Sequence, residues 1–164
     1  MESVFKDINK FAGKYKALDM FAIFCARVLP YSMVLIMLVF LIWQRHGMLF
    51  LFAMASGGLG RLLNEVGHIL YKKQRPAHLF GTKVLIPVPK NFSFPSGHSS
   101  FLFGVSFFLF FYFSNLGLIF LALSFLVGVA RVFCGVHWFR DILGGVLMGF
   151  ISALIINNIT MLWI

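Results

Sequence analysis

The chain has 164 residues, of which 60% are hydrophobic and only 12% charged, and 22 of them are Phe. A soluble domain of this size could not cover so much apolar surface, so the composition excludes a soluble globular protein and favours an all-α bundle of membrane-spanning helices. The formal charge of +9 fits lipid head groups or phosphorylated substrates better than nucleic acid in so hydrophobic a chain. We expect an integral membrane protein with one domain over residues 1–164 and no nucleic-acid partner.

One surface helix and about five membrane spans are predicted. Residues 4–18 alternate apolar side chains with lysines, which predicts an amphipathic helix at the membrane interface within residues 1–19. Apolar runs long enough to cross a bilayer follow it, since a span needs roughly 20 residues. They predict spans over residues 20–43, 47–71, 97–113, 118–136 and 139–163.

Residues 72–95 form the only long polar connection between the predicted spans. This segment holds four of the five prolines and five cationic side chains. Loops of that length are uncommon in compact proteins unless they have a function. The order of the spans places this loop, the start of the third span and the junction of the fourth and fifth spans at one membrane face. We therefore expect the polar chemistry to gather at that face, with 72–95 as an active-site loop.

Two polar clusters belong to this loop and its end. Arg75-Pro76 follows Lys72 and Lys73, where the alternative to a functional role is an ordinary cationic stop after a span. Pro95-Ser96-Gly97-His98 opens the third predicted span, where Ser96 can cap the helix and the free amides near Gly97 can bind an anion. The alternative here is an ordinary helix start with an interfacial histidine.

A third cluster combines Arg131, His137 and Asp141. After Asp19 the only carboxylates are Glu65 and Asp141, and Asp141 lies four residues after His137, close to one helical turn. An imidazole held by a carboxylate can act as a nucleophile, and a second, protonated histidine can give its proton to a departing oxygen. Arginine binds phosphate oxygens bidentately. The combination predicts phosphotransfer with no metal or other cofactor, and an interfacial ion pair is the alternative.

Together these clusters resemble a known set of motifs. Arg75-Pro76, Pro95-Ser96-Gly97-His98 and Arg131-x5-His137-x3-Asp141 look like the three ordered motifs of the type 2 phosphatidic acid phosphatase (PAP2) family, over roughly residues 60–150. The resemblance implies a helical-bundle lipid phosphatase that forms a phosphohistidine intermediate. It implies that His137 is the nucleophile, that Asp141 orients it and that His98 is the general acid. It also implies phosphate binding by Arg75, Arg131, Ser96 and the Gly97 amide.

Two positions depart from the family pattern. The lysine that usually stands seven residues before the first-motif arginine is His68 here, and the serine that usually precedes the third-motif arginine is Ala130. His68, Lys72 and Lys73 are the candidates for the missing phosphate-binding cation. His68 lies about two helical turns before Arg75, so both can project from one face. Lys72 and Lys73 are nearer to Arg75 and reach solvent more easily.

The likeness is greatest to bacterial undecaprenyl-diphosphate phosphatases, in the short chain, the amphipathic start and Asn64 before Arg75-Pro76. It implies undecaprenyl diphosphate as substrate, with lipid A 1-phosphate and phosphatidylglycerophosphate as alternatives. It also implies a protein of the bacterial cytoplasmic membrane whose active site is extracytoplasmic. Four lysines in residues 1–19 favour the opposite orientation under the positive-inside rule.

Two other classes of protein are weighed against this one. A small anion channel or transporter would need charged positions deep in several spans, and only Arg27, Arg61 and Glu65 qualify. A metal-binding membrane protein would use His98, His137 and Asp141. Neighbouring arginines and lysines would repel a divalent cation there, so we expect no metal site.

Overall fold

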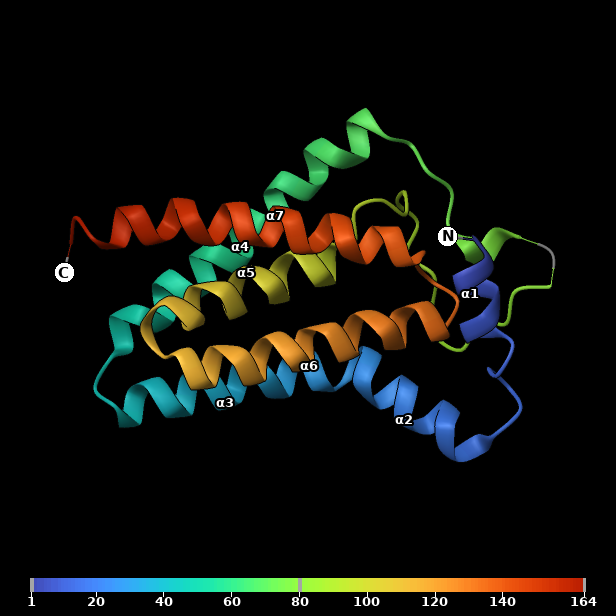
Figure 1. Ribbon diagram of the computed structural model, residues 1–164, viewed down its shortest axis with the longest axis horizontal. Helices are drawn as coiled ribbons and strands as arrows, with labels where there is room; N and C mark the ends of the chain where they lie inside the picture. Colours follow the sequence, from blue (N-terminus) through green and yellow to red (C-terminus); the bar gives the residue numbers. More distant parts are fainter. Residues whose placement is uncertain (1, 80, 164) are drawn as a thin grey trace.

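The computed structural model describes residues 2–79 and 81–163 (Figure 1). The described residues form seven α-helices and one short 3-10 helix and contain no strand, which confirms the all-α prediction. The elements are α1 Glu2–Asn9, α2 Lys16–Arg27, α3 Leu29–Trp43, α4 Gly47–Leu70, η1 Pro76–His78, α5 Gly97–Tyr112, α6 Ser114–Phe133 and α7 Phe139–Thr160.

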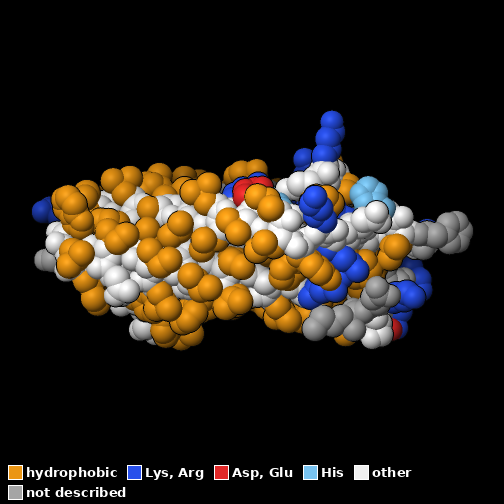
Figure 2. All heavy atoms as spheres, turned by 90° about the horizontal axis from the view of Figure 1, so that it is seen from above, with side chains coloured by type: hydrophobic (Ala, Val, Ile, Leu, Met, Phe, Trp, Pro, Cys, Tyr) orange, Lys and Arg blue, Asp and Glu red, His pale blue; other side chains and the backbone are white. Residues whose placement is uncertain are grey.

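Most helices of the bundle have the length and the apolar composition needed to cross a membrane. By length and composition α4, α6 and α7 each qualify, and α2 with α3 qualifies as one bent pair. Helix α5 is apolar but shorter, with 16 residues. Hydrophobic side chains cover most of the face in Figure 2, whereas most lysines and arginines gather at the end that carries α1. Each of the five predicted spans is helical, and α5 is the short one.

The N-terminal segment differs from the single surface helix predicted over residues 4–18. Helix α1 ends at Asn9 and α2 begins at Lys16. Between them Gly13 has a φ of 76°, a left-handed conformation that glycine adopts without steric cost. Asp19 Oδ1 accepts the Gly13 N–H at 3.0 Å, which holds this turn.

The predicted first span, residues 20–43, is also interrupted. Helices α2 and α3 meet at Val28 and are bent by 49° relative to one another. Pro30 stands in the first turn of α3. Proline lacks an N–H donor and its ring crowds the preceding turn, so it is tolerated at a helix start but not within a continuous helix. The bend opens space beside the N-terminal end of α5.

Helices α4, α5 and α7 pack closely at the centre through small residues. A Cβ on Gly149 of α7 would lie 2.6 Å from Gly104 N of α5, and a Cβ on Gly60 of α4 would lie 2.7 Å from Ser100 O. Ser56 Oγ donates to Gly104 O at 2.8 Å across the α4–α5 contact. Close backbone approach and interhelical hydrogen bonds replace the hydrophobic effect as the source of helix association in lipid.

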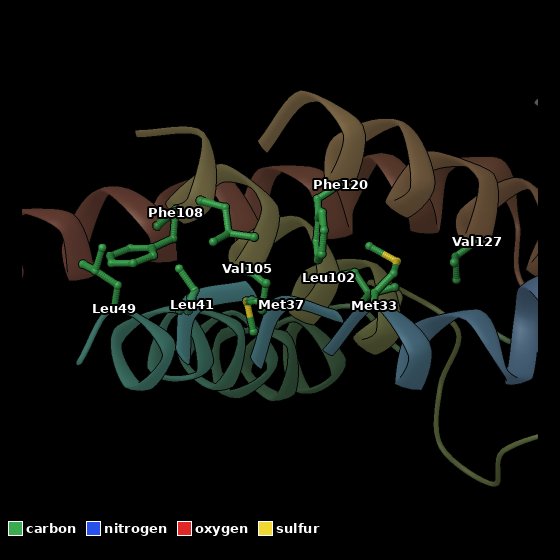
Figure 3. Packing of buried hydrophobic residues seen from close by; sticks show 12 residues of the cluster. Met33, Met37, Leu41, Leu49, Leu102, Val105, Phe108, Phe120 and Val127 are labelled. Atoms are coloured by element: carbon green, nitrogen blue, oxygen red, sulfur yellow. The ribbon is translucent and has the colours of Figure 1, made fainter. Parts of the chain in front are cut away.

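A hydrophobic cluster joins α3 to α4, α5 and α6 (Figure 3). Its labelled members are Met33, Met37, Leu41, Leu49, Leu102, Val105, Phe108, Phe120 and Val127. Within this apolar interior Ser106 of α5 and Ser124 of α6 satisfy each other with a hydrogen bond of 2.9 Å. The packing fixes α5 and α6 relative to one another, and their neighbouring ends carry His98 and Arg131.

Candidate active site

Residues from all three sequence clusters meet in one small chamber of about 50 Å³. It lies where the loop after α4, the start of α5, the end of α6 and the α6–α7 connection come together. The residues that line this polar chamber are Arg61, His68, Arg75, Pro89, Asn91, Gly97, His98, Arg131 and His137. The span order therefore places the clusters at one face, as expected from the sequence.

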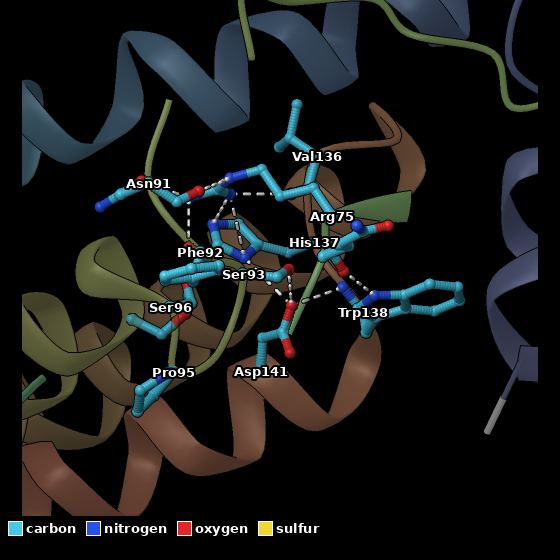
Figure 4. A network of polar contacts seen from close by, with 12 residues as sticks. Arg75, Asn91, Phe92, Ser93, Pro95, Ser96, Val136, His137, Trp138 and Asp141 are labelled. Atoms are coloured by element: carbon cyan, nitrogen blue, oxygen red, sulfur yellow. Dashed lines mark hydrogen bonds and ion pairs between the residues drawn. The ribbon is translucent and has the colours of Figure 1, made fainter. Parts of the chain in front are cut away.

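His137 and Asp141 form a buried pair beside the chamber (Figure 4). His137 Nδ1 lies 3.2 Å from Asp141 Oδ2, and the two residues are 2% and 0% exposed. His137 precedes α7, whereas Asp141 stands in its first turn and accepts the Trp138 N–H at 2.8 Å. His137 and Asp141 therefore meet because Asp141 caps the start of α7, and not because they share a helix face.

The loop that follows α4 also holds Asp141. Ser93 Oγ donates to Asp141 Oδ2, and the Ser96 N–H donates to the Asp141 carbonyl at 2.9 Å. The expected capping of α5 by the Ser96 side chain is wrong, since its hydroxyl instead accepts the Ser99 Oγ–H at 3.1 Å. Ser96 is fully buried and is not among the residues that line the chamber. The buried Asp141 Oδ1 has no hydrogen-bond partner within the described residues.

Arg75 is buried and held by loop carbonyl groups. Its Nε donates to Asn91 O at 3.0 Å, and its Nη2 donates to Asn91 Oδ1 at 2.7 Å and to Phe92 O at 2.9 Å. Its Nη1 donates to Val136 O at 2.9 Å. These bonds connect loop 72–95 to the α6–α7 connection and fix the guanidinium beside His137.

The contacts of His137 determine its tautomer. Arg75 Nη1 lies 3.1 Å from His137 Nε2, and a guanidinium can only donate, so Nε2 is the acceptor. The ring proton is therefore assigned to Nδ1, which faces Asp141. Burial lowers the pKa of His137 to about 4, and the guanidinium groups of Arg131 and Arg75 add to this against the opposing hydrogen bond to Asp141. The imidazole is neutral near pH 7 with an unprotonated Nε2.

His98 and Arg131 reach the chamber with donors or acceptors to spare. Arg131 Nη1 donates to Ala26 O at 3.2 Å, but its buried Nε has no partner within the described residues. His98 stands in the first turn of α5 and forms no side-chain hydrogen bond with any described residue. Both side chains are therefore available to an anion in the chamber, in contrast to Arg75.

The three candidates for the missing first-motif cation are placed differently. His68 lines the chamber, with its Nε2 3.2 Å from Pro95 O. Lys72 is exposed and does not line the chamber, while the Lys73 ammonium lies 5.7 Å from the centre of the Trp138 ring. The structure therefore brings only His68 of the three to the site, and its ring is engaged with the turn before α5.

Two grooves border the chamber and share lining residues with it. The α3–α5 groove has a volume of about 550 Å³ and is lined almost entirely by apolar side chains of α3, α4 and α5. It shares Arg61, Gly97 and His98 with the chamber. A second groove of about 560 Å³ lies at the bend between α2 and α3 and shares His98 and Arg131 with the chamber. His98 therefore stands where both grooves meet the chamber.

Helix α1 supports the site from outside. Asn9 Nδ2 donates to Lys83 O at 2.8 Å and to Phe133 O at 2.9 Å, and its Oδ1 accepts the Lys83 N–H at 3.0 Å. Gly135 follows α6 with a φ of 80°, and a Cβ there would overlap the Lys83 carbonyl. The end of α6, and with it the approach to His137, is thus clamped between α1 and the loop.

The chemistry of the donor set does not favour a resident metal ion. Within residues 2–79 and 81–163 no group of three or more His, Cys, Asp and Glu side chains is arranged to hold one. His98 and His137 share their chamber with Arg61, Arg75 and Arg131, which would repel a divalent cation. A metal-independent reaction stays a prediction.

The chain is similar to known proteins over most of its length. Over 155 residues the chain is 28% identical to the bacitracin transport permease protein BcrC of Bacillus licheniformis, covering 93% of this chain and 76% of that protein. LpxE of Aquifex aeolicus has the same fold, with a TM-score of 0.77 and 24% identity over 95% of this chain and 93% of that one. The PAP2-type phosphatidylglycerolphosphate phosphatase of Bacillus subtilis gives a TM-score of 0.71 and 24% identity, over 97% and 85%.

The family assignment covers the whole site. Residues 46–163 match the model of the PAP2 superfamily, and this range contains all three sequence motifs. Within this range α4, α6 and α7 are long and apolar enough to cross a membrane. The chain therefore belongs to the PAP2 superfamily and is an integral-membrane lipid phosphatase of that family.

Proposed function

We propose that the enzyme removes the terminal phosphate of undecaprenyl diphosphate through a phosphohistidine formed on His137. The observation that carries this is the set of contacts around the imidazole, with Asp141 at Nδ1 and Arg75 at Nε2. These contacts favour a neutral ring whose Nε2 lone pair accepts from Arg75 Nη1 until a phosphoryl group replaces that contact. That is the state a nitrogen nucleophile needs.

The first step transfers the phosphoryl group to the enzyme. His137 Nε2 attacks the terminal phosphorus, and an N–P bond forms as the P–O bond to the lipid phosphate breaks. His98, protonated once the phosphate anion has entered the chamber, gives its proton to the departing oxygen. Asp141 accepts the Nδ1–H bond throughout and stabilises the positive charge that develops on the ring.

The second step releases inorganic phosphate. A water attacks the phosphorus as the N–P bond breaks, and the proton of that water passes to His98. Arg131, with its unpartnered Nε, and the Gly97 amide at the start of α5 bind the phosphoryl oxygens. Arg75 Nη1 joins them when the N–P bond replaces its contact with His137 Nε2. We place Ser96 behind this turn, where it ties the α5 start to Asp141.

The α3–α5 groove supports a lipid as the substrate. Its lining is apolar over most of its length and ends at His98, so a hydrocarbon tail can lie in it while the phosphate enters the chamber. Tail burial alone does not choose among undecaprenyl diphosphate, lipid A 1-phosphate and phosphatidylglycerophosphate. The choice of the diphosphate rests on the motif resemblance around Asn64 and Arg75-Pro76.

The test is phosphate release by purified protein across these three lipids, with EDTA present. We expect the highest kcat/KM for undecaprenyl diphosphate, and we expect His137→Ala to abolish turnover because no other chamber residue replaces the nucleophile. His78→Ala is the matched control, since His78 is exposed and lies outside the chamber. Near wild-type activity in His137→Ala, or turnover that stops when EDTA is added, would contradict the mechanism.

We further propose that the site faces outward across the bacterial cytoplasmic membrane. The lysines of residues 1–19 favour the reverse, but α1 packs on the protein through Asn9 and is not a loop that flanks a span. The exposed Asn115 lies at the start of α6, away from the chamber. In a variant without Cys25 and Cys134, Asn115→Cys should react with an impermeant thiol reagent only after permeabilisation. Labelling of intact cells would place the site in the cytoplasm.

A further inference from the structure

Arg61 is a charged residue within a membrane span that has no protein partner. It lies inside α4, far from both ends of the helix, and its side chain is exposed. Within residues 2–79 and 81–163 it makes no ion pair and no side-chain hydrogen bond. Glu65, one turn further along α4, instead lies 3.4 Å from His68 Nδ1. An unpaired charge at such a position is costly in a membrane, so it indicates a functional contact.

The guanidinium of Arg61 lies against the start of α5. A Cβ on Gly97 would overlap Arg61 Nη1, so the guanidinium lies directly against the backbone of Gly97. The first turn of a helix carries partial positive charge and free amides, and a cation placed there raises the electrostatic energy unless an anion lies between them. The Arg61 guanidinium and the start of α5 together therefore favour the binding of a negatively charged group.

The position of Arg61 indicates which negative group this is. Arg61, Gly97 and His98 are shared by the polar chamber and the α3–α5 groove, so Arg61 stands on the path between them. The terminal phosphate already has Arg75 and Arg131 in the chamber. In a lipid diphosphate the second phosphate lies between the terminal phosphate and the hydrocarbon tail. That order matches the order of chamber, Arg61 and groove.

We propose that Arg61 binds the phosphate that stays on the lipid, and that it makes the enzyme select lipid diphosphates over lipid monophosphates with the same tail. This inference rests on the proposed function, because it assumes that the terminal phosphate reacts at His137. Arg61 then acts on substrate binding, since its phosphate remains bonded to the lipid before and after the reaction. Its loss should appear mainly in KM for diphosphates.

The experiment compares farnesyl diphosphate with farnesyl monophosphate, which share one tail. Removing a charge-assisted hydrogen bond costs about 1.5–3 kcal/mol, so Arg61→Ala and Arg61→Gln should raise KM for the diphosphate about 10- to 100-fold while KM for the monophosphate changes less than about threefold. Arg140→Ala is the control, because Arg140 is another arginine near the site but does not line the chamber. The melting temperature of each variant checks folding.

A second measurement does not depend on diphosphate turnover. Methylenediphosphonate and inorganic phosphate are compared as inhibitors of farnesyl monophosphate hydrolysis, and Arg61→Gln should weaken inhibition by the diphosphonate only. Equal losses for both inhibitors, or equal changes in KM for both farnesyl substrates, would overturn the role of Arg61. A wild-type protein that hydrolyses neither substrate would instead contradict the proposed function.

Discussion

The substitution Asp141→Asn examines how a single carboxylate oxygen sets the state of His137. In the native site Asp141 Oδ2 accepts hydrogen bonds from His137 Nδ1, the Trp138 N–H and Ser93 Oγ. Asparagine keeps the shape but has only one acceptor oxygen. If that oxygen takes the Oδ2 position, the amide NH₂ takes the place of Oδ1, which is buried and has no partner within the described residues. If it takes the other position, the NH₂ faces three donors.

Both arrangements impair the reaction, by different amounts. An unsatisfied buried amide costs about 1–3 kcal/mol of stability, and a neutral amide stabilises the imidazolium-like state less than a carboxylate does. In the other arrangement the ring proton moves from Nδ1 to Nε2, which removes the nucleophilic lone pair and points an N–H at Arg75. We expect kcat to fall about 10⁴-fold, by analogy with the same substitution in a serine-protease triad, or about 5 kcal/mol in the barrier.

The assay is phosphate release from farnesyl diphosphate at saturating concentration, together with thermal unfolding in the same detergent. Asp7→Asn is the matched control, because Asp7 is an exposed carboxylate paired with Lys10 at the surface. A loss of kcat below about tenfold in folded Asp141→Asn would refute the idea that the carboxylate sets the tautomer, since the triad comparison predicts a far larger effect. A loss explained by unfolding would show in the melting temperature.

Two further predictions concern the histidines. Protonation of His137 removes the nucleophile, and burial lowers its pKa to about 4, so kcat/KM for an aryl phosphate, corrected for titration of the substrate, should fall on the acid side near pH 4. An acid limb near 6.5, the ordinary histidine value, would contradict the lowered pKa of His137. His98→Ala should reduce kcat for a lipid phosphate more than for an activated aryl phosphate, since a good leaving group needs little protonation; equal losses on the two substrates would remove the general-acid role.

The sequence was sufficient to predict the motif residues of the chamber but not the hydrogen bonds that hold them. Arg75, His98, Arg131 and His137 stand at ends of apolar runs, and the order of those runs brings such ends to one face. The hydrogen bond of Ser93 to Asp141 had no comparable signal. Ser93 lies in an irregular loop that is held by hydrogen bonds from the Arg75 side chain to the Asn91 and Phe92 carbonyls. Hydrophobic periodicity carries no information about such bonds.

Other features of the structure do have a signal in the sequence. Gly13 and Pro30 are residue types that end or bend helices, and they account for the two breaks in the N-terminal third of the chain. Arg61 is a charge within a predicted span, and such a charge is itself evidence of a site. Asn9 is different, because its contacts with Lys83 and Phe133 join segments far apart in the chain.

The two arginines of the motifs differ in how their guanidinium groups are held, and this assigns them different work in the proposed reaction. Arg75 donates to Asn91, Phe92 and Val136 before any substrate is present, so its position beside His137 does not depend on phosphate. Arg131 has one carbonyl partner and a buried Nε without one. These bonds to loop carbonyls can stay in place during the reaction, which suits Arg75 to keeping Nε2 unprotonated and oriented until the phosphorus arrives. An unsatisfied buried donor is relieved only when an acceptor arrives, which suits Arg131 to binding the phosphoryl oxygens.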